Sequence, residues 1–330
     1  KQICTARADL VRKVSIGYLL EQRLRIPIFQ RRYCWHTDLW DTLFDDVSCL
    51  ASGLKDVHPV GRLTCVTGGP GDGRISVIDG QQRNTTAVLL LAAVRDLAAA
   101  RAEGSAEYAA LAARVDGVLF TDARALDAWL SSRSTAGGVF VEEGEALDFA
   151  ALIPTYCDRA SYFAATLPPR AAATGGGTWS RPNEAKQHFV ARLRERGAEH
   201  LAAVVDAVLL KLEWLFFPID MSGNHDDGTE NLHMIYERLA ERDEGIRKHF
   251  GMRRKEAANM GAADFVRNLL LGSFSEEADA IRMYKEHWLP IEQAACAAME
   301  QARSGDATDI LNKMLEAFLR SQPPHLLKAP

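Results

Sequence analysis

Several well-known kinds of site are missing from this sequence. Its six cysteines are scattered, and no two have the Cys-x-x-Cys spacing of a zinc ribbon or a redox motif. Scattered thiols with mostly apolar neighbours are typical of reduced core residues in a cytoplasmic protein. No Gly-Lys-Ser/Thr, His-x-Glu-x-x-His or Gly-x-Ser-x-Gly motif is present, and the nine histidines show no metal-ligand spacing. The sequence thus gives no sign of a phosphate loop, a zinc protease or a serine hydrolase.

The sequence also has little net charge and no long apolar run. Its formal net charge is -5 over 330 residues, so a DNA contact would need a local basic patch rather than a global field. Such a patch is available at Arg23, Arg25, Arg31 and Arg32. The longest apolar run, 87–94, is far too short to span a bilayer. The chain is long enough for a large core and for two compact units.

The most informative stretch joins a strand, a polar turn and a helix. The β-branched segment 75–78 leads directly into Asp79-Gly80-Gln81-Gln82-Arg83, and an apolar helical pattern follows from 85 to 97. A junction of this kind gathers backbone N–H groups and the positive end of a helix at one point. It therefore predicts a phosphate-handling site.

Each polar residue of this turn offers chemistry that such a site needs. Gly80 permits a sharp turn, and Asp79 could hold a metal ion or a sugar hydroxyl. Gln81 and Gln82 could orient water or a base, and Arg83 could clamp a phosphate. The alternative is a plain strand-to-helix turn in which Asp79 is a satisfied cap. Two adjacent glutamines and an arginine beside an apolar strand favour the phosphate site.

A second polar segment, 25–35, is dense in groups that bind anions and stack on flat rings. Its planar donors and aromatic faces are Phe29, Arg31, Arg32, Tyr33 and Trp35. Large aromatic side chains are core residues more often than ligand platforms. Because the neighbours of Tyr33 and Trp35 are strongly polar, we expect at least one of the two to border a DNA or nucleotide site.

Two motifs carry a resemblance to a known family. Residues 26–35 spell Ile-Pro-x-Phe-Gln-Arg-x-Tyr-x-Trp, and residues 78–83 spell Ile-Asp-Gly-Gln-Gln-Arg. Together they resemble the ParB/sulfiredoxin-like N-terminal module of modification-dependent restriction proteins of the GmrSD type. A third piece, 231–239 followed by 264–270, is similar to the family's helical Asp-Leu-Ile-Arg-Asn signature, whereas Asn84 stands where the family usually has leucine. In its domain size and its richness in alanine and arginine, the chain is similar to the phosphorothioate-sensing effectors of anti-phage systems.

The resemblance implies a nucleoside triphosphatase that couples recognition of modified DNA to a nuclease. Phosphoryl hydrolysis depends mostly on positioning and on charge neutralisation. In this first hypothesis Asp79 holds Mg²⁺, Gln81 or Gln82 positions water, and Arg83 stabilises the transferred charge. GTP as the preferred nucleotide is implied by the resemblance to the phosphorothioate-sensing effectors.

Further contacts follow from the same hypothesis. The residues expected to bind the nucleotide are Gly80, Thr85, Thr86, Gln30, Arg31 and, as the resemblance implies, Arg267 and Asn268. The residues expected to bind DNA are Phe29, Arg32, Tyr33 and Trp35. A sulfur atom in place of a phosphate oxygen is larger, softer and less well hydrated, so its reader needs an apolar concavity beside cationic donors. The segment 28–35 supplies both.

Two other hypotheses stay open. In one, the same pocket binds DNA phosphates or a nucleotide as a conformational switch, without turnover, and a partner does the chemistry. In the other, this chain cleaves DNA itself, but the carboxylate pairs of two-metal cleavage are not evident. The His-Asn-His nuclease core that the resemblance leads one to expect is absent. We therefore expect an HNH-type nuclease domain either after Pro330 or on a partner chain.

The predicted fold class is α+β, with a small mixed sheet and helices followed by a mainly α-helical region. The resemblance implies that the sheet is ParB/sulfiredoxin-like. Strands are predicted at 60–66, 74–78 and 215–219, and helices at 9–24, 85–97, 184–196, 199–212, 230–241, 262–271, 275–288 and 291–303. The break at 167–182, with Pro-Pro and a triple glycine, is the predicted boundary between a nucleotide- and DNA-sensing domain (1–170) and a helical domain (183–330).

Overall fold

The computed structural model describes most of the chain in two compact units. The described residues are 11–67, 73–135, 138–139, 141, 145–169, 181–220, 263, 266–267, 270–271, 274, 277–302, 310–311 and 313–315. By contacts, the first unit comprises residues 1–27 and 35–226, and the second comprises 28–34 and 227–330. This division differs from the predicted domains 1–170 and 183–330, whose boundary stays a prediction. Across these residues, the helices are all too short or too polar to cross a membrane.

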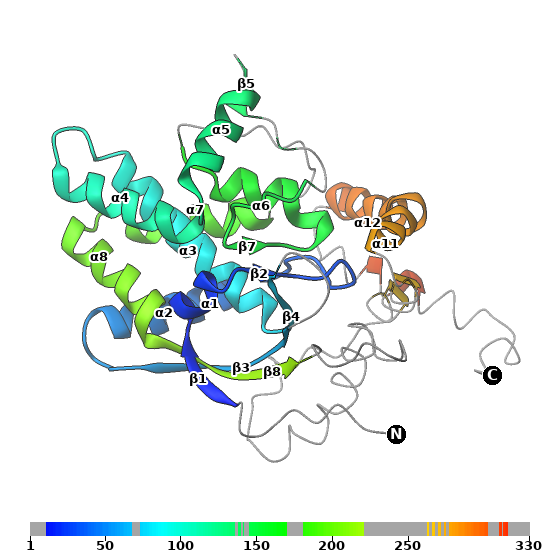
Figure 1. Ribbon diagram of the computed structural model, residues 1–330, viewed down its shortest axis with the longest axis horizontal. Helices are drawn as coiled ribbons and strands as arrows, with labels where there is room; N and C mark the ends of the chain where they lie inside the picture. Colours follow the sequence, from blue (N-terminus) through cyan, green and yellow to red (C-terminus); the bar gives the residue numbers. More distant parts are fainter. Residues whose placement is uncertain are drawn as a thin grey trace, which may run out of the picture. The chain divides into compact units, whose positions relative to one another are not determined.

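A six-stranded mixed sheet organises the first unit (Figure 1). Its order is β1-β8-β3-β4-β2-β7, with the bounds β1 (Arg12–Ser15), β8 (Leu212–Asp220), β3 (His58–Thr67), β4 (Ile75–Asp79), β2 (Leu24–Arg25) and β7 (Leu152–Ile153). β3 runs antiparallel to β4 and parallel to β8, and β1 is antiparallel to β8. β2 is parallel to both of its neighbours. The mixed sheet confirms the predicted α+β class, while its likeness to ParB/sulfiredoxin stays a prediction.

The predicted strands are present, and two of them, β3 and β8, are longer than expected. The predicted segment 215–219 is part of β8, where Leu212, Trp214 and Phe216 are buried and Glu213 and Leu215 are not. This alternation places one face of the strand in the core. The predicted helix over 9–24 is wrong in its first part, because β1 pairs with β8 there, and only α1 (Ile16–Glu21) is helical.

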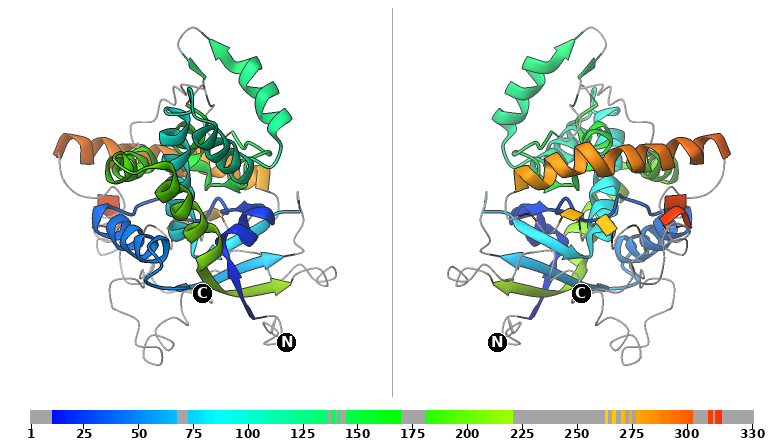
Figure 2. Two further views of the ribbon diagram at one scale, coloured as in Figure 1. Left: turned by 90° about the vertical axis from the view of Figure 1, so that its left-hand side faces the viewer. Right: turned by 90° about the vertical axis from the view of Figure 1, so that its right-hand side faces the viewer.

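Helices α2 to α8 complete the first unit. Their bounds are α2 (Thr37–Ala51), α3 (Gln81–Ala99), α4 (Ala106–Leu119), α5 (Ala123–Arg133), α6 (Arg159–Thr166), α7 (Arg181–Leu193) and α8 (Ala198–Asp206), with short turns η2 (Tyr156–Asp158) and η3 (Ala207–Lys211) and a hairpin of β5 (Ser134–Thr135) and β6 (Gly138–Val139). Figures 1 and 2 show α3, α4, α7 and α8 on one side of strands β3 and β8. α3 packs against α4, α6, α7 and α8. Since a helix that is apolar all round must be buried, α3 forms the centre of this core.

One buried arginine ties these helices together. Arg95 on α3 is fully buried, and its guanidinium contacts Asp96 on the same helix, Asp116 on α4 and the carbonyls of Thr166 and Leu167 at the end of α6. A buried charge is tolerated only when it is paired and hydrogen-bonded. This arginine is therefore structural, and it fixes the helix whose first turn carries the Asp-Gly-Gln-Gln-Arg motif.

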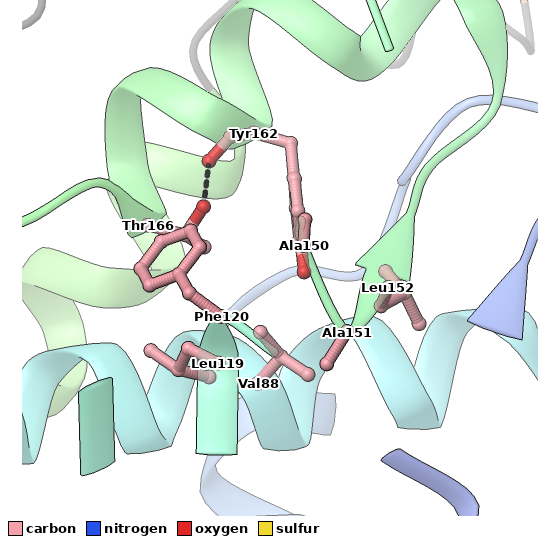
Figure 3. Close-up of a pocket in the computed structure, with 8 residues that line it drawn as sticks. All are labelled: Val88, Leu119, Phe120, Ala150, Ala151, Leu152, Tyr162 and Thr166. Carbon is pink, nitrogen blue, oxygen red and sulfur yellow. Dashed lines mark hydrogen bonds between the residues drawn. The ribbon is translucent and has the colours of Figure 1, made fainter. Parts of the chain in front are cut away.

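A small apolar gap beside α3 is a packing feature and not a ligand site. Figure 3 shows its walls, which are Val88, Leu119, Phe120, Ala150, Ala151, Leu152, Tyr162 and Thr166. It has no space for a water molecule, and the Thr166 hydroxyl donates to the Tyr162 carbonyl. Burial raises the pKa of the Tyr162 phenol, so the phenol of Tyr162 stays neutral.

The second unit contains the segment 28–34 together with a long helical run. This run consists of α11 (Glu277–Met283), the π turn η4 (Tyr284–Trp288) and α12 (Leu289–Ala302). Two separate helices, 275–288 and 291–303, are predicted from the sequence, but the helix continues through Pro290. Since proline clashes with the carbonyl one turn earlier, the wider turn just before it accommodates the ring. The predicted helix 230–241 and most of 262–271 lie outside the described residues.

Candidate functional site

The polar turn after β4 has a backbone that only glycine accommodates well. Gly80 has a φ of +101°, and α3 begins at the next residue. A Cβ at Gly80 would lie 2.7 Å from Leu63 Cδ1 and 3.1 Å from the Trp214 ring. The turn is therefore pressed against β3 and β8, in agreement with the predicted role of Gly80 in a sharp turn. Asn84, where the family usually has leucine, donates its amide Nδ2 to the Gly80 carbonyl at 3.2 Å.

Asp79 ends β4 with a carboxylate that is open to solvent. Its side chain is 47% exposed, and its Oδ2 lies 3.6 Å from Arg62 Nη2 on the neighbouring strand β3. The N-cap position of α3 is Gly80 and not Asp79, so the alternative that makes Asp79 the helix cap is not supported by its position. Burial, followed by the charge of Asp79, raises the pKa of the Cys65 thiol.

Arg83 lies in a place prepared by a glycine in β3. Its guanidinium carbon is 5.8 Å from the centre of the Trp214 ring. A Cβ at Gly61 would lie 3.2 Å from Arg83 Nη1, and Gly61 has a φ of +128° beside an irregularity in the β3–β8 register. A glycine inside a strand often marks a bulge or a close approach. Here the missing side chain of Gly61 leaves room for the guanidinium.

The structure therefore brings a carboxylate and two arginines to one end of β3 and β4. Arg62 faces Asp79, and Arg83 lies against the adjacent Gly61. Neither Arg62 nor Gly61 was predicted from the sequence to belong to the site. The one signal was a glycine within the predicted strand 60–66. The two guanidinium groups could both donate to an anionic ligand.

The remaining predicted residues of the turn are less accessible. Gln81, Gln82, Thr85 and Thr86 are all buried in the first turns of α3. The Thr86 hydroxyl donates to the Gln82 carbonyl at 2.8 Å, so it serves the helix itself. Their predicted roles toward water and nucleotide stay predictions, and Asp79 and Arg83 are the motif residues with exposed surface.

One carboxylate is enough to fit the Mg²⁺ that the first hypothesis requires. Mg²⁺ in phosphoryl-transfer sites commonly binds one or two carboxylates, substrate phosphate oxygens and several waters. Asp79 offers such a carboxylate, half-exposed and at a turn. Within the described ranges, no cluster of three or more His, Cys, Asp or Glu residues is arranged to hold a metal. Of the described residues, Asp79 is thus the one that we expect to hold the ion.

The arginine-rich segment 28–34 belongs to the second unit and is mostly buried there. Phe29, Gln30 and Tyr33 are buried, and Arg31 and Arg32 are half-buried. Their predicted contacts with nucleotide or DNA stay predictions. Trp35 belongs to the first unit and is half-exposed, so of the two aromatic residues expected to border a site it is the accessible one.

Arg267, predicted to bind the nucleotide, is buried within the second unit. Its Nε donates to the Phe29 carbonyl at 3.0 Å, and its Nη1 contacts Glu292 Oε1 at 3.2 Å. This guanidinium holds the backbone of the arginine-rich segment. Its role toward a nucleotide stays a prediction, and Asn268 lies outside the described residues.

Glu292 on α12 is the residue of this unit that the sequence analysis missed. Each carboxylate oxygen accepts two hydrogen bonds: Oε2 from Arg32 Nε (3.1 Å) and Tyr284 Oη (2.6 Å), and Oε1 from Arg267 Nη1 (3.2 Å) and Trp288 Nε1 (2.6 Å). Burial would raise the pKa of Glu292, but the charges of Arg32 and Arg267 and the two neutral donors hold it below its usual value. The carboxylate is therefore ionised. The only available signal was the spacing of Tyr284, Trp288 and Glu292, four residues apart along a helix.

Comparison with known proteins identifies one relationship. A family model described as "GmrSD restriction endonuclease, N-terminal domain" matches residues 8–249, well over half of the chain. The match includes both sequence motifs and the whole β3–β4–α3 turn, whereas α11, η4 and α12 lie beyond it. No curated protein matches the chain.

Proposed function

Because this chain belongs to the family of GmrSD restriction endonuclease N-terminal domains, we propose that it is the nucleotide-hydrolysing and DNA-sensing module of a restriction system. It hydrolyses a nucleoside triphosphate, preferably GTP, when it meets modified DNA. Hydrolysis in turn controls an HNH-type nuclease domain, in cis or on a partner chain. The observation that supports the proposal most is the half-exposed carboxylate of Asp79 opposite Arg62, with Arg83 against the adjacent Gly61, at a strand-to-helix turn.

The division of labour at the turn follows from the chemistry of phosphoryl transfer. Mg²⁺ bound by Asp79 would neutralise charge on the phosphate oxygens. The guanidinium of Arg83 lies near the Trp214 ring and against Gly61, where no side chain displaces it. Such a preorganised guanidinium stabilises developing charge with little rearrangement. Arg62 adds a second cation beside Asp79, and it would help to bind the anionic nucleotide.

The sensing function is proposed for the segment 28–35. It combines aromatic and aliphatic side chains with Arg31 and Arg32, the mixture that a phosphorothioate group requires. Because the net charge of the chain is -5, affinity has to come from a few local contacts. We therefore expect DNA binding to depend only modestly on salt.

Hydrolysis is tested by measuring phosphate release from GTP and ATP, with and without phosphorothioated duplex DNA. Arg83→Ala should lower the rate on the order of 10³-fold, because one charge clamp commonly contributes that much. Asp79→Ala should act alike and should weaken the dependence on Mg²⁺. Arg194→Ala is the matched control, since the side chain of Arg194 is 69% exposed and forms its ion pair with the adjacent Glu195. Wild-type turnover by a folded Arg83→Ala protein would refute the assignment.

A second candidate function is nucleotide or DNA binding without turnover. The observation in its favour is the burial of both motif glutamines, Gln81 and Gln82, which leaves no exposed amide in the motif to orient a water. Isothermal titration with GTP and ATP separates the two functions. Saturable, Asp79-dependent binding with no phosphate release would support the switch and exclude the hydrolase.

A further inference from the structure

The buried carboxylate of Glu292 lies outside the part of the chain that defines the family. The family match ends at residue 249, whereas Glu292 is on α12 and is 5% exposed. We propose that Glu292 is a positioning residue for the DNA-sensing segment 28–34, and that α11, η4 and α12 are a working part of the sensing module. This inference rests on the proposed sensing function of that segment.

Glu292 is linked to the segment 28–34 at two points. It contacts Arg32 directly, through Nε. It also contacts Arg267, which in turn donates to the Phe29 carbonyl. One contact therefore fixes a side chain of the segment and the other fixes its backbone. Both depend on the same negative charge.

The chemistry of the cluster suits positioning better than stability. Removing ionic groups from water is costly, and well-packed apolar residues often stabilise a protein equally well in the same place. A carboxylate with two donors on each oxygen instead fixes the directions of all four partners. Tyr284 and Trp288 come from η4, immediately before α12. They hold the carboxylate, and the carboxylate holds the two arginines.

Loss of the charge at position 292 should loosen both the side chain of Arg32 and the backbone at Phe29. Misplacing a contact group by about 1 Å can cost on the order of 100-fold. We therefore expect Glu292→Gln to weaken binding of phosphorothioated duplex by about 10- to 100-fold. The variant keeps the size of the side chain and one acceptor oxygen, so the change tests the charge.

The experiment is a double-mutant cycle on the full chain, read by fluorescence anisotropy with labelled phosphorothioated and plain duplexes. The proteins are wild type, Glu292→Gln, Arg32→Met and the double variant, with Glu286→Gln as control because Glu286 is 59% exposed on the same helical run. If Glu292 acts through Arg32, then Glu292→Gln should lower the DNA affinity much less in the Arg32→Met background than in the wild type. The two losses of affinity should therefore not add. The control should bind as wild type does.

The outcomes separate this inference from the function on which it rests. A wild-type protein that binds neither duplex refutes the sensing function itself. Wild-type binding with unchanged affinity in Glu292→Gln overturns the positioning role, and fully additive losses of affinity in the double variant overturn the part of it that runs through Arg32. If circular dichroism shows that Glu292→Gln does not fold, Glu292→Asp replaces it, since it keeps the charge but is too short to reach all four donors. Unchanged affinity in folded Glu292→Asp would equally overturn the inference.

Discussion

Gly61 offers a sharp test of how Arg83 is held. Substitution by alanine places a Cβ 3.2 Å from Arg83 Nη1 and imposes a side chain on a backbone with a φ of +128°. A positive φ of this kind costs a residue other than glycine about 1–3 kcal/mol. The contact with Arg83 can be relieved cheaply, because the end of a flexible side chain can move away. Gly61→Ala should therefore destabilise the protein by a modest amount and displace the guanidinium.

The chain contains a control for the backbone term alone. Gly104 also has a positive φ, +78°, but a Cβ there meets nothing within 4 Å. Gly104→Ala should thus lower the free energy of unfolding by a similar amount, again about 1–3 kcal/mol, while leaving hydrolysis unchanged. Unfolding is measured with urea, and turnover by phosphate release at a temperature where both variants are folded.

The two variants should differ in turnover and not in stability. We expect Gly61→Ala to lose on the order of 10- to 100-fold in hydrolysis rate, since a displaced charge clamp retains only part of its effect. If folded Gly61→Ala hydrolyses nucleotide at the same rate as Gly104→Ala, then hydrolysis does not depend on the position of the Arg83 guanidinium against Gly61. The proposed arrangement of the site would then be wrong.

Three further predictions concern Arg62, Glu292 and the binding of phosphorothioated DNA. Arg62→Ala removes the cation 3.6 Å from Asp79 and should raise the KM for nucleotide several-fold, with a smaller effect on kcat, in steady-state assays. Glu292 has a pKa below its usual 4.5 in the folded state. Its contribution to stability is complete above that pH and is lost as the pH falls through the lower folded value, so urea unfolding should show the gap between wild type and Glu292→Gln narrowing below pH 4.5. Phosphorothioation should strengthen duplex binding by about 1–3 kcal/mol, the size of one good local contact, in titrations at two salt concentrations.

Each of these has a clear contrary result. An unchanged KM in Arg62→Ala would mean that this arginine serves only Asp79. A gap between wild type and Glu292→Gln that stays constant from pH 6 to pH 3 would contradict the lowered pKa of Glu292. Equal affinities for plain and phosphorothioated duplexes at both salts would exclude phosphorothioate sensing, and they would leave membership of the family untouched.

Local patterns predicted the part of the site that is local in sequence. β4, the turn at Gly80 and α3 follow one another without a break, so a β-branched run, a glycine and an apolar helix were enough to predict them. The burial of α3 on all sides was visible in the uninterrupted apolar run 87–94. Even the glycine inside β3 could be noted, although its purpose could not.

Contacts between distant segments were out of reach of the same reasoning. Arg32 and Glu292 are 260 residues apart, and no spacing rule connects them. The parallel pairing of β3 with β8 likewise joins strands separated by most of the first unit, and it is this pairing that brings Trp214 under Arg83. Burial of Gln81 and Gln82 was missed because polar side chains in a first helical turn are usually exposed.

The placement of the segment 28–34 has a consequence for how the chain can be divided. Residues on both sides of it belong to the first unit, yet the segment itself belongs to the second. A cut anywhere between Asp220 and Ala263 would therefore not separate the C-terminal helices from the N-terminal part, because Glu292 and Arg267 would still bind the segment. Two separately expressed pieces should reassemble around these contacts, which makes the chain a natural starting point for a split protein.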